Sequence, residues 1–245
     1  MKYKLSVGAI FKNEAHSIKE WIEHYIFHGV DHFYLIDDSS SDDYDIEPYM
    51  DKITLYKDNF DYYLGRQRDM YNKYILPHIK ESEWLLICDL DEYMWCPNEI
   101  NMTKTLDICK NIGQIQVEHT IFGSNNYVKQ PKSIVSNFTK RSKEQPTRSY
   151  GNRKYFVNSA FEFNSLNVHH ATFVDKNDEL NKFLLLNDYF ILNHYCCQSK
   201  EFWNNVKCTR GDCDNYRTRK EEDFNEVDLN DVEDLRLMNQ NINIL

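Results

Sequence analysis

Glycine is scarce in this chain, whose 245 residues include only seven. Neither GxGxxG nor GxxxxGK[ST] occurs in it. These patterns build the phosphate-binding turns of dinucleotide-binding Rossmann domains and of P-loop NTPases, because glycine lets the backbone approach a phosphate closely. The sequence therefore argues against both of these phosphate sites.

Long apolar runs are missing as well. No stretch approaches 18 apolar residues, and residues 1–4 lead directly into a strand-like segment without the apolar core of a signal peptide. We therefore expect no membrane span and a cytoplasmic location. The seven cysteines include no CxxC pair, which predicts reduced structural thiols and no zinc knuckle.

Positive charge is in deficit. Lys and Arg number 29 against 39 Asp and Glu, so the net charge is -10, which argues against nucleic acid and anionic membranes as partners. The length suits one domain with a buried core. We expect that domain over residues 1–215, followed by an acidic tail over 216–245 that is a surface helix or partly disordered.

Apolar runs without helical spacing alternate with amphipathic segments in the first part of the chain. Such alternation predicts an α/β fold with a Rossmann-like, mostly parallel central sheet flanked by helices. The pattern loosens later, and we expect a mixed C-terminal part. The predicted strands cover 5–11, 32–36, 53–56, 84–88, 115–122, 155–157 and 189–193, and the predicted helices cover 14–26, 66–79 and 199–207.

The most informative segment is the acidic motif Asp89-Leu90-Asp91-Glu92, which directly follows the apolar run 84–88. Burying several anions there would be costly unless a cation neutralises them. Carboxylates at this spacing can hold Mg²⁺ or Mn²⁺ with positions left open for phosphate oxygens. A solvated acidic turn after a strand is the alternative.

Polar side chains also follow the first two predicted strands. Lys12, Asn13 and Glu14 close the first, and Asp37 and Asp38 close the second. Ligands of parallel sheets bind beyond the carboxyl ends of the strands, where the acidic motif also lies. Asp37 and Asp38 could accept bonds from ribose hydroxyls or a base, although Asp38 could equally cap the segment that follows.

An ordered set of segments resembles glycosyltransferase family 92 and its family-2-like relatives, which are nucleotide-sugar enzymes of the GT-A fold. The resemblance spans about residues 3 to 211. Its parts are Lys12-Asn13-Glu14, Glu20-Trp21-Ile22-Glu23-His24-Tyr25, the segment 29–40, Gln67 with Tyr71-Asn72, Asp89-Leu90-Asp91-Glu92-Tyr93, Phe122-Gly123-Ser124, 154–157 and Leu192-Asn193-His194-Tyr195.

The resemblance implies a cation, Mn²⁺ or Mg²⁺, bound by Asp89 and Asp91 with His194 as the third ligand. His169 and His170 compete with His194 for that role. Such an ion would act as a Lewis acid on the departing diphosphate of a nucleoside diphosphate sugar, with a UDP-hexose as the first donor to consider.

The resemblance also implies a binding surface for the donor. Lys12, Asn13 and Glu14 would contact the nucleoside. Arg66 and Arg68 are candidates for the diphosphate, with Gln67 and Asp69 close by. Lys207 with Arg210 would close over the phosphates, since guanidinium pairs well with them.

Transfer of the sugar to a glycan acceptor with inversion needs a base for the acceptor hydroxyl. We predict Glu118 for this role, with Glu162, Asp175 and Glu92 as alternatives. Two other functions remain open. One is a sugar-nucleotide nucleotidyltransferase, although such enzymes usually carry an N-terminal glycine-rich loop; the other is a non-catalytic nucleotide- or glycan-binding module.

Overall fold

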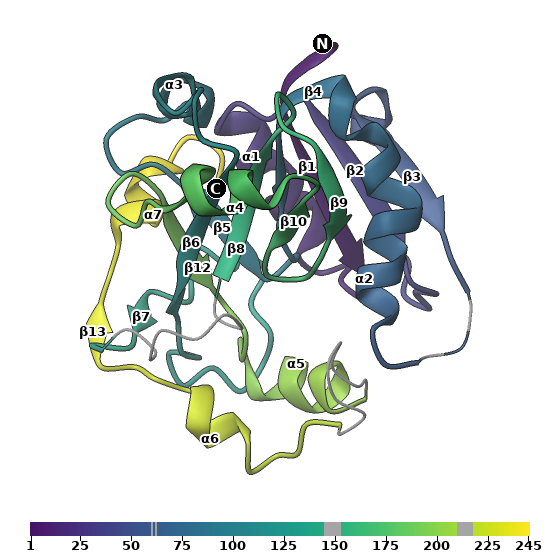
Figure 1. Ribbon diagram of the computed structural model, residues 1–245. Coiled ribbons are helices and arrows are strands. Elements are labelled where there is room, and N and C mark those ends of the chain that lie inside the picture. The colour runs from purple at the N-terminus through teal and green to yellow at the C-terminus, as the bar shows by residue number, and fades with distance from the viewer. Residues whose placement is uncertain (60, 62, 145–152, 210–217) are drawn as a thin grey trace.

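The computed structural model describes residues 1–59, 61, 63–144, 153–209 and 218–245, and its elements alternate as a βαβ pattern at the N-terminus (Figure 1). The strands are β1 Tyr3–Phe11, β2 His32–Asp37, β3 Ile53–Lys57, β4 Ser82–Ile87, β5 Glu92–Trp95, β6 Gln114–Ile121, β7 Lys140–Arg141, β8 Arg153–Asn158, β9 Phe163–Leu166, β10 Ala171–Phe173, β11 Phe183–Leu185, β12 Ile191–His194 and β13 Val232–Glu233. The α-helices are α1 Ile18–Phe27, α2 Arg66–Met70, α3 Met102–Ile108, α4 Lys176–Lys182, α5 Lys200–Asn205, α6 Phe224–Val227 and α7 Arg236–Gln240. Shorter turns are the 3₁₀ segments η1 Glu47–Lys52, η3 Leu76–Glu81 and η5 Lys207–Thr209 and the π-helical turn η2 Tyr71–Ile75.

A nine-stranded sheet in the order β3-β2-β1-β4-β8-β6-β12-β5 forms the centre, with β11 beside β6. The first four strands in this order are mutually parallel. Strand β8 is antiparallel to both β4 and β6, and β5 is antiparallel to β12. The α/β class and the parallel first half are confirmed, while the sheet as a whole is mixed.

Strand β1 is buried and mostly apolar from Leu5 to Ala9 because both of its faces are covered. Leu5, Val7 and Ala9 belong to the cluster that includes α1, whereas Gly8 faces the helical segment 66–81. A Cβ at Gly8 would lie 2.8 Å from the Cδ1 atom of Ile75, so this helical segment packs directly on the strand. Buried strands of this kind read as continuous hydrophobic runs, as parallel sheets require.

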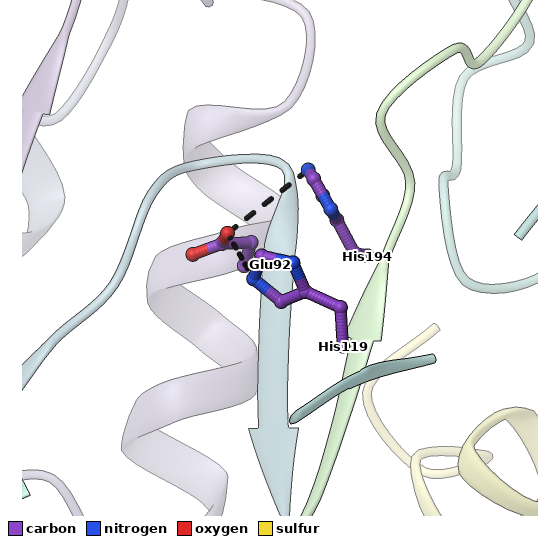
Figure 2. A group of neighbouring side chains, drawn as sticks. All are labelled: Glu92, His119 and His194. Atoms are coloured by element: carbon purple, nitrogen blue, oxygen red, sulfur yellow. Dashed lines mark ion pairs between the residues drawn. The ribbon is translucent and has the colours of Figure 1, made fainter. Parts of the chain in front are cut away.

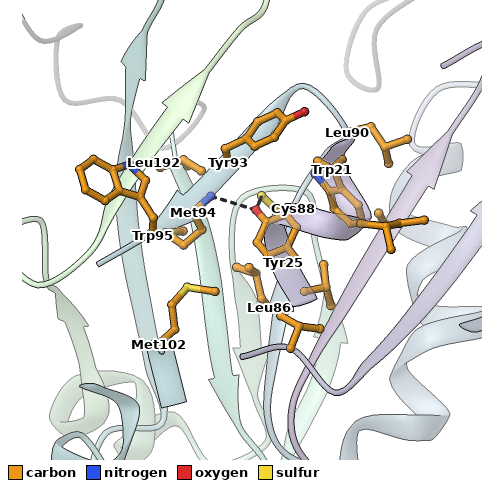
Figure 3. Packing of buried hydrophobic residues seen from close by; sticks show 14 of the residues in the cluster. Trp21, Tyr25, Leu86, Cys88, Leu90, Tyr93, Met94, Trp95, Met102 and Leu192 are labelled. Carbon is orange, nitrogen blue, oxygen red and sulfur yellow. Dashed lines mark hydrogen bonds between the residues drawn. The ribbon is translucent and has the colours of Figure 1, made fainter. Parts of the chain in front are cut away.

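Helix α1 anchors the backbone of the acidic motif. The indole Nε1 of Trp21 donates to the carbonyl oxygens of Asp89 and Glu92, at 3.0 Å each. The Tyr25 hydroxyl donates to the Glu92 carbonyl at 3.1 Å and accepts from the Met94 amide at 3.0 Å. These aromatic residues lie in a tight cluster with the strands that flank the motif (Figure 3). The turn after β4 is therefore held from inside the core.

The segment predicted as one helix over 66–79 changes its geometry twice. It passes from α2 through the π-helical turn η2 into the 3₁₀ turn η3. Pro77 explains the second change, because its ring and missing N–H are incompatible with a continuing α-helix. The helical spacing predicts Met70, Tyr74 and Ile75 on the inner face; Met70 and Ile75 are buried against the sheet, whereas Tyr74 is half-buried and Tyr71 is buried in its place.

The C-terminal residues 218–245 pack against the domain in several places. Strand β13 pairs with β7, and Leu237 of α7 is buried in the core that includes α1. The Asn241 side chain forms hydrogen bonds with His24 and His28 of that region, at 2.9 Å each. The acidic composition of this segment did not indicate these contacts.

The described helices are all too short or too polar to cross a membrane. The described cysteines are all free thiols, in agreement with the sequence-based expectation.

Candidate functional site

The carboxyl ends of β1, β2 and β4 meet at one edge of the sheet, because β1 pairs in parallel with both neighbours. The loops at this edge are tied together by Asn13, which adopts the left-handed region with φ 56. Its amide donates to Ser40 Oγ at 3.1 Å, and its side-chain oxygen accepts from the Ser41 amide at 2.8 Å. The predicted convergence of the strand ends is therefore present.

Asp89 lies at the end of β4 and is surrounded by donors. Lys154 of β8, which is fully buried, places its Nζ 2.6 Å from Asp89 Oδ2. Gln67 Nε2 and the Tyr71 hydroxyl donate to Asp89 Oδ1, at 3.2 and 3.3 Å. Both oxygens of Asp89 thus have partners within the protein.

Asp91 is buried and paired with a second lysine. Lys207 Nζ donates to Asp91 Oδ2 at 2.5 Å, and the other oxygen, Oδ1, lies 3.7 Å from His194 Nε2. The backbone carbonyl of Asp91 accepts from the Tyr195 amide at 2.8 Å. The structure therefore brings together Asp91, His194 and Lys207, three residues that the sequence predicted for one site.

Glu92 adds a third carboxylate, which faces two imidazoles (Figure 2). Its Oε1 atom lies 2.8 Å from His119 Nε2 and 4.0 Å from His194 Nε2. Its Oε2 atom accepts from the Asp89 amide at 2.8 Å and lies 3.5 Å from Lys154 Nζ. Each oxygen of Glu92 therefore has a different set of neighbours.

Electrostatic coupling compensates for the burial of these groups. Burial opposes ionisation of Asp91, yet Lys207 and His194 hold the pKa of its carboxyl well below the usual value. Burial disfavours a charged His194, but Asp91 raises its pKa to about 9. Burial and the neighbouring His194 lower the pKa of His119 to about 4. Near pH 7 His194 is charged and His119 is neutral.

The cluster is close to charge balance without any added ion. The carboxylates of Asp89, Asp91 and Glu92 face Lys154, Lys207 and the protonated His194. A divalent cation here would take the place of a proton on His194, and one net positive charge would then remain for an anionic ligand.

A bound cation needs several ligand atoms close together, and the carboxylate oxygens of the motif and the ring nitrogens of His119 and His194 provide such atoms. Among the described residues two groups converge to within 4.8 Å, namely Asp89 with Asp91 and Glu92, and Glu92 with His119 and His194. The predicted set of Asp89, Asp91 and His194 is not one of these groups, because Asp89 lies on the side of Lys154.

Asp37 and Asp38, which were predicted to contact the nucleoside, are engaged by neighbouring residues of the protein. Asp37 accepts from the Ser40 amide and from the Tyr44 hydroxyl, both at 2.8 Å. Asp38 pairs with Arg66 at 2.5 Å. Lys12 is half-buried at the end of β1, and Glu14 is buried where the chain turns toward α1.

Arg66, predicted for the diphosphate, is itself buried between two carboxylates. Besides Asp38 it pairs with Asp58, at 3.1 Å. A cavity of about 440 Å³ adjoins it. The residues that line this cavity are Asp58, Asp61, Tyr63, Arg66, Asp69, Met70 and Lys73.

Glu118, the predicted acceptor base, lies toward the same end of the sheet as Asp89. Ile87 of β4 pairs with Tyr155, which pairs with Gln116, so Glu118 follows that row of residues by two positions. Its Oε2 accepts from Asn187 at 2.9 Å, and its buried Oε1 accepts no hydrogen bond from any described residue but forms an ion pair with Arg153 Nη2 at 3.6 Å.

Two further predicted residues are His169 and Arg210. His169 uses its Nδ1 atom with the Arg153 carbonyl oxygen, at 3.0 Å, and belongs to neither candidate cation group. Arg210 lies outside the described residues.

Sequence reasoning missed the contributions of His119 and Lys154. His119 sits in a predicted strand with alternating polar residues, and Lys154 opens another, so both could be read as ordinary strand positions. The sequence signal for both is a lysine or histidine beside or within a strand of apolar residues, in a chain that also carries an acidic motif at the end of another strand.

No family model matches this chain, and no curated protein sequence matches it. Among solved structures, S. aureus TarS (residues 1–349, in complex with UDP-GlcNAc) is similar over 98% of this chain and 73% of that one, with 15% identity and a TM-score of 0.41. HddC from Yersinia pseudotuberculosis is similar over 77% of this chain and 92% of that one, with 13% identity and a TM-score of 0.37. The chain spans 42% of the longer S. aureus TarS, with 15% identity and a TM-score of 0.40. The likeness is distant at these values and says nothing of what this chain binds.

Proposed function

We propose that this protein is a glycosyltransferase of the GT-A type that transfers a hexose from a nucleoside diphosphate sugar to a glycan acceptor. The observation that carries the proposal is the largely buried cluster of Asp91, His194 and Lys207 beside the carboxyl end of β4, in the parallel part of the sheet. Ligands of such sheets bind at this edge. Carboxylates, an imidazole and an ammonium group together suit a diphosphate and its counter-ion.

The residues have separate roles in this proposal. Lys207 offers its ammonium to a phosphate oxygen when Asp91 turns to a divalent cation, and that cation supplies Lewis-acid chemistry at the leaving diphosphate. Lys12, Asn13, Glu14, Asp37 and Asp38 form the wall for the nucleoside because they close the two neighbouring strands. The family resemblance in the sequence makes UDP the first nucleotide to test.

Binding and transfer can be tested in sequence. Calorimetry with UDP, GDP and CMP, each with and without Mn²⁺, should reveal one preferred nucleotide, which we expect to be UDP. The donors to follow are UDP-galactose and UDP-GlcNAc, the latter being the ligand in one of the TarS structures. Release of UDP that depends on an added glycan would support transfer, whereas release of pyrophosphate from a sugar phosphate and UTP would point to a nucleotidyltransferase. No binding of any nucleotide would exclude the proposal.

A further inference from the structure

Three neighbouring strands each direct one possible metal ligand to the same point. Strands β6, β12 and β5 are adjacent in the sheet, and they carry His119, His194 and Glu92 respectively. His194 pairs directly with Glu92 across β12 and β5, and His119 lies two positions before the residue of β6 that pairs with His194. Residues in register or two positions apart share one face of a sheet. The three side chains therefore converge on one face, as Figure 2 shows.

We propose that Glu92, His119 and His194 form the binding site of a divalent transition-metal ion. The inference deepens the proposed function, on which it rests for its biological meaning, by naming residues that hold the cation at the diphosphate end of the site. The ligand set predicted from the sequence was Asp89, Asp91 and His194. In the site proposed here, Glu92 and His119 take the place of Asp89.

Distances between the ligand atoms fit such an ion after a small contraction. Imidazole nitrogens and carboxylate oxygens lie about 2.0–2.2 Å from a bound ion, so neighbouring ligand atoms are about 3.0–3.5 Å apart. Glu92 Oε1 lies 2.8 Å from one imidazole and 4.0 Å from the other, and all three ligand atoms are within 4.8 Å of one another. Rotation of the two imidazole rings could bring these distances into range.

The surroundings orient the ligands. Glu92 Oε2 is held by the Asp89 amide and Lys154, which leaves Oε1 directed at the imidazoles. Hydrogen bonds to the outer oxygen of a ligating carboxylate have this orienting effect in known sites. His119 is almost fully buried, and its Nε2 atom lies 2.8 Å from Glu92 Oε1. A metal ion bound between these two atoms would replace that direct contact, with loss of any proton on Nε2.

Asp89 is less suited to this ion. Its two oxygens already accept from Lys154, Gln67 and Tyr71, so a metal bond to either oxygen would compete with donors that are in place. Asp91 can contribute Oδ1 as a further ligand, because that atom already lies 3.7 Å from His194 Nε2.

The donor set also selects the class of metal. Two imidazoles and a carboxylate favour first-row transition metals, whereas Mg²⁺ and Ca²⁺ prefer oxygen ligands alone. His194 is the most exposed of the three ligands, with 19% of its side chain accessible, so an open coordination position would be on its side. An anionic phosphate oxygen could enter there.

Titration of the full chain, stripped of metal by a chelator and free of nucleotide, tests the site. We expect calorimetry to show one Co²⁺ bound per chain, with Mg²⁺ weaker by at least about 100-fold. His119→Gln should weaken Co²⁺ binding by at least about 100-fold, because loss of even an outer-shell partner costs about 10–100-fold. Asp89→Asn should change it by less than about threefold, and His169→Gln is the matched histidine control.

Anomalous diffraction from wild-type crystals soaked in Co²⁺ gives an answer that does not depend on the folding of a variant. The expected ion lies about 2.0–2.3 Å from Glu92 Oε1 and from the Nε2 atoms of His119 and His194. An ion bound by Asp89 and Asp91, normal Co²⁺ affinity in His119→Gln, or no saturable Co²⁺ binding would each overturn the inference.

Separate titrations distinguish the failure of this inference from the failure of the proposed function. If the wild-type protein binds Co²⁺ but no nucleotide, and His119→Gln loses Co²⁺ binding, the metal site is supported and the proposed function is excluded. If UDP binds with the same affinity after chelation and in His119→Gln, nucleotide binding is supported and the metal site is excluded.

Discussion

Asp91 has two partners, and this allows its structural and functional roles to be separated. Asp91→Asn leaves the Lys207 ammonium buried without its carboxylate, and breaking a buried pair in this way costs about 3–5 kcal/mol. The double variant Asp91→Asn/Lys207→Met removes both charges and should recover most of the free energy of unfolding, measured by urea denaturation. We expect UDP binding to be lost in both variants.

The double variant is the decisive one in this comparison. If it regained stability and also bound UDP with normal affinity, Asp91 would be a structural residue and the proposed cation site would lose a member. A matched control is Asp107→Asn, which changes an exposed carboxylate paired with Lys4 and should alter stability by less than about 0.5 kcal/mol.

Glu118 can be tested as the acceptor base without changing its shape. Its buried Oε1 accepts no hydrogen bond from any described residue, although Arg153 Nη2 lies 3.6 Å away, and it could receive the proton of an acceptor hydroxyl. Glu118→Gln should lower kcat by about 10²–10⁴-fold with an unchanged Kd for the donor, since general-base catalysis contributes about that much. Steady-state kinetics and donor calorimetry would measure the two quantities. A normal kcat would return the role to Glu162, Asp175 or Glu92.

At the scale of elements, Asp234 joins the C-terminal segment to the domain. Its Oδ2 accepts from Arg141 Nε at 2.8 Å, next to β13, and from Arg236 at 2.6 Å, at the start of α7. Burial opposes its ionisation, but the two arginines lower its pKa to about 2, against about 3.9 in an unfolded chain. A carboxyl with a depressed folded pKa stabilises the protein above the unfolded pKa and loses this contribution as pH falls toward the folded value.

The lowered pKa of Asp234 determines how the loss of stability in Asp234→Asn depends on pH. At pH 7 the variant should be less stable than wild type by on the order of 2 kcal/mol, and the difference should shrink steadily between about pH 5 and pH 2. Urea unfolding at pH 7, 4 and 3 would measure it. An equal difference at pH 7 and pH 3 would show that the ion pairs contribute nothing.

The strands and helices of the first half were predictable because their apolar periodicity is strong. Leu5 to Phe11 and Trp84 to Cys88 are continuous apolar runs, and the structure has β1 and β4 there. The antiparallel placement of β8 between β4 and β6 was not predictable, since periodicity reports burial and says nothing of which strand lies alongside. The contacts of Asn241 with α1 were hidden for a similar reason, because an acidic segment gives no sign of a few buried positions.

The site was predictable only in part. Asp91, His194 and Lys207 were predicted from the motif and the resemblance, and they do meet. His119 and Lys154 contribute through long-range strand pairing, which spacing along the chain cannot reveal. Asp37 and Arg66 have local partners, Tyr44 and Asp58, that a sequence does not specify.

For the whole molecule, the net charge repels an anionic nucleotide, whereas the positively charged groups of the proposed site attract it. A chain with a net charge of -10 repels an anionic nucleotide at long range, and this repulsion weakens as salt screens it. In the proposed function, Lys154, Lys207 and a cation at His194 would provide the local attraction. We expect UDP affinity to change little between low and physiological salt when Mn²⁺ is present.

In the proposed function, a nucleoside diphosphate binds at the carboxyl edge of the sheet beside Asp91. A crystal structure of the protein with UDP and Mn²⁺ would show this binding mode. We expect the diphosphate within hydrogen-bond distance of Lys207 Nζ and the ion in contact with His194. A nucleotide bound elsewhere, or a diphosphate that touches neither Lys207 nor the ion at His194, would contradict it.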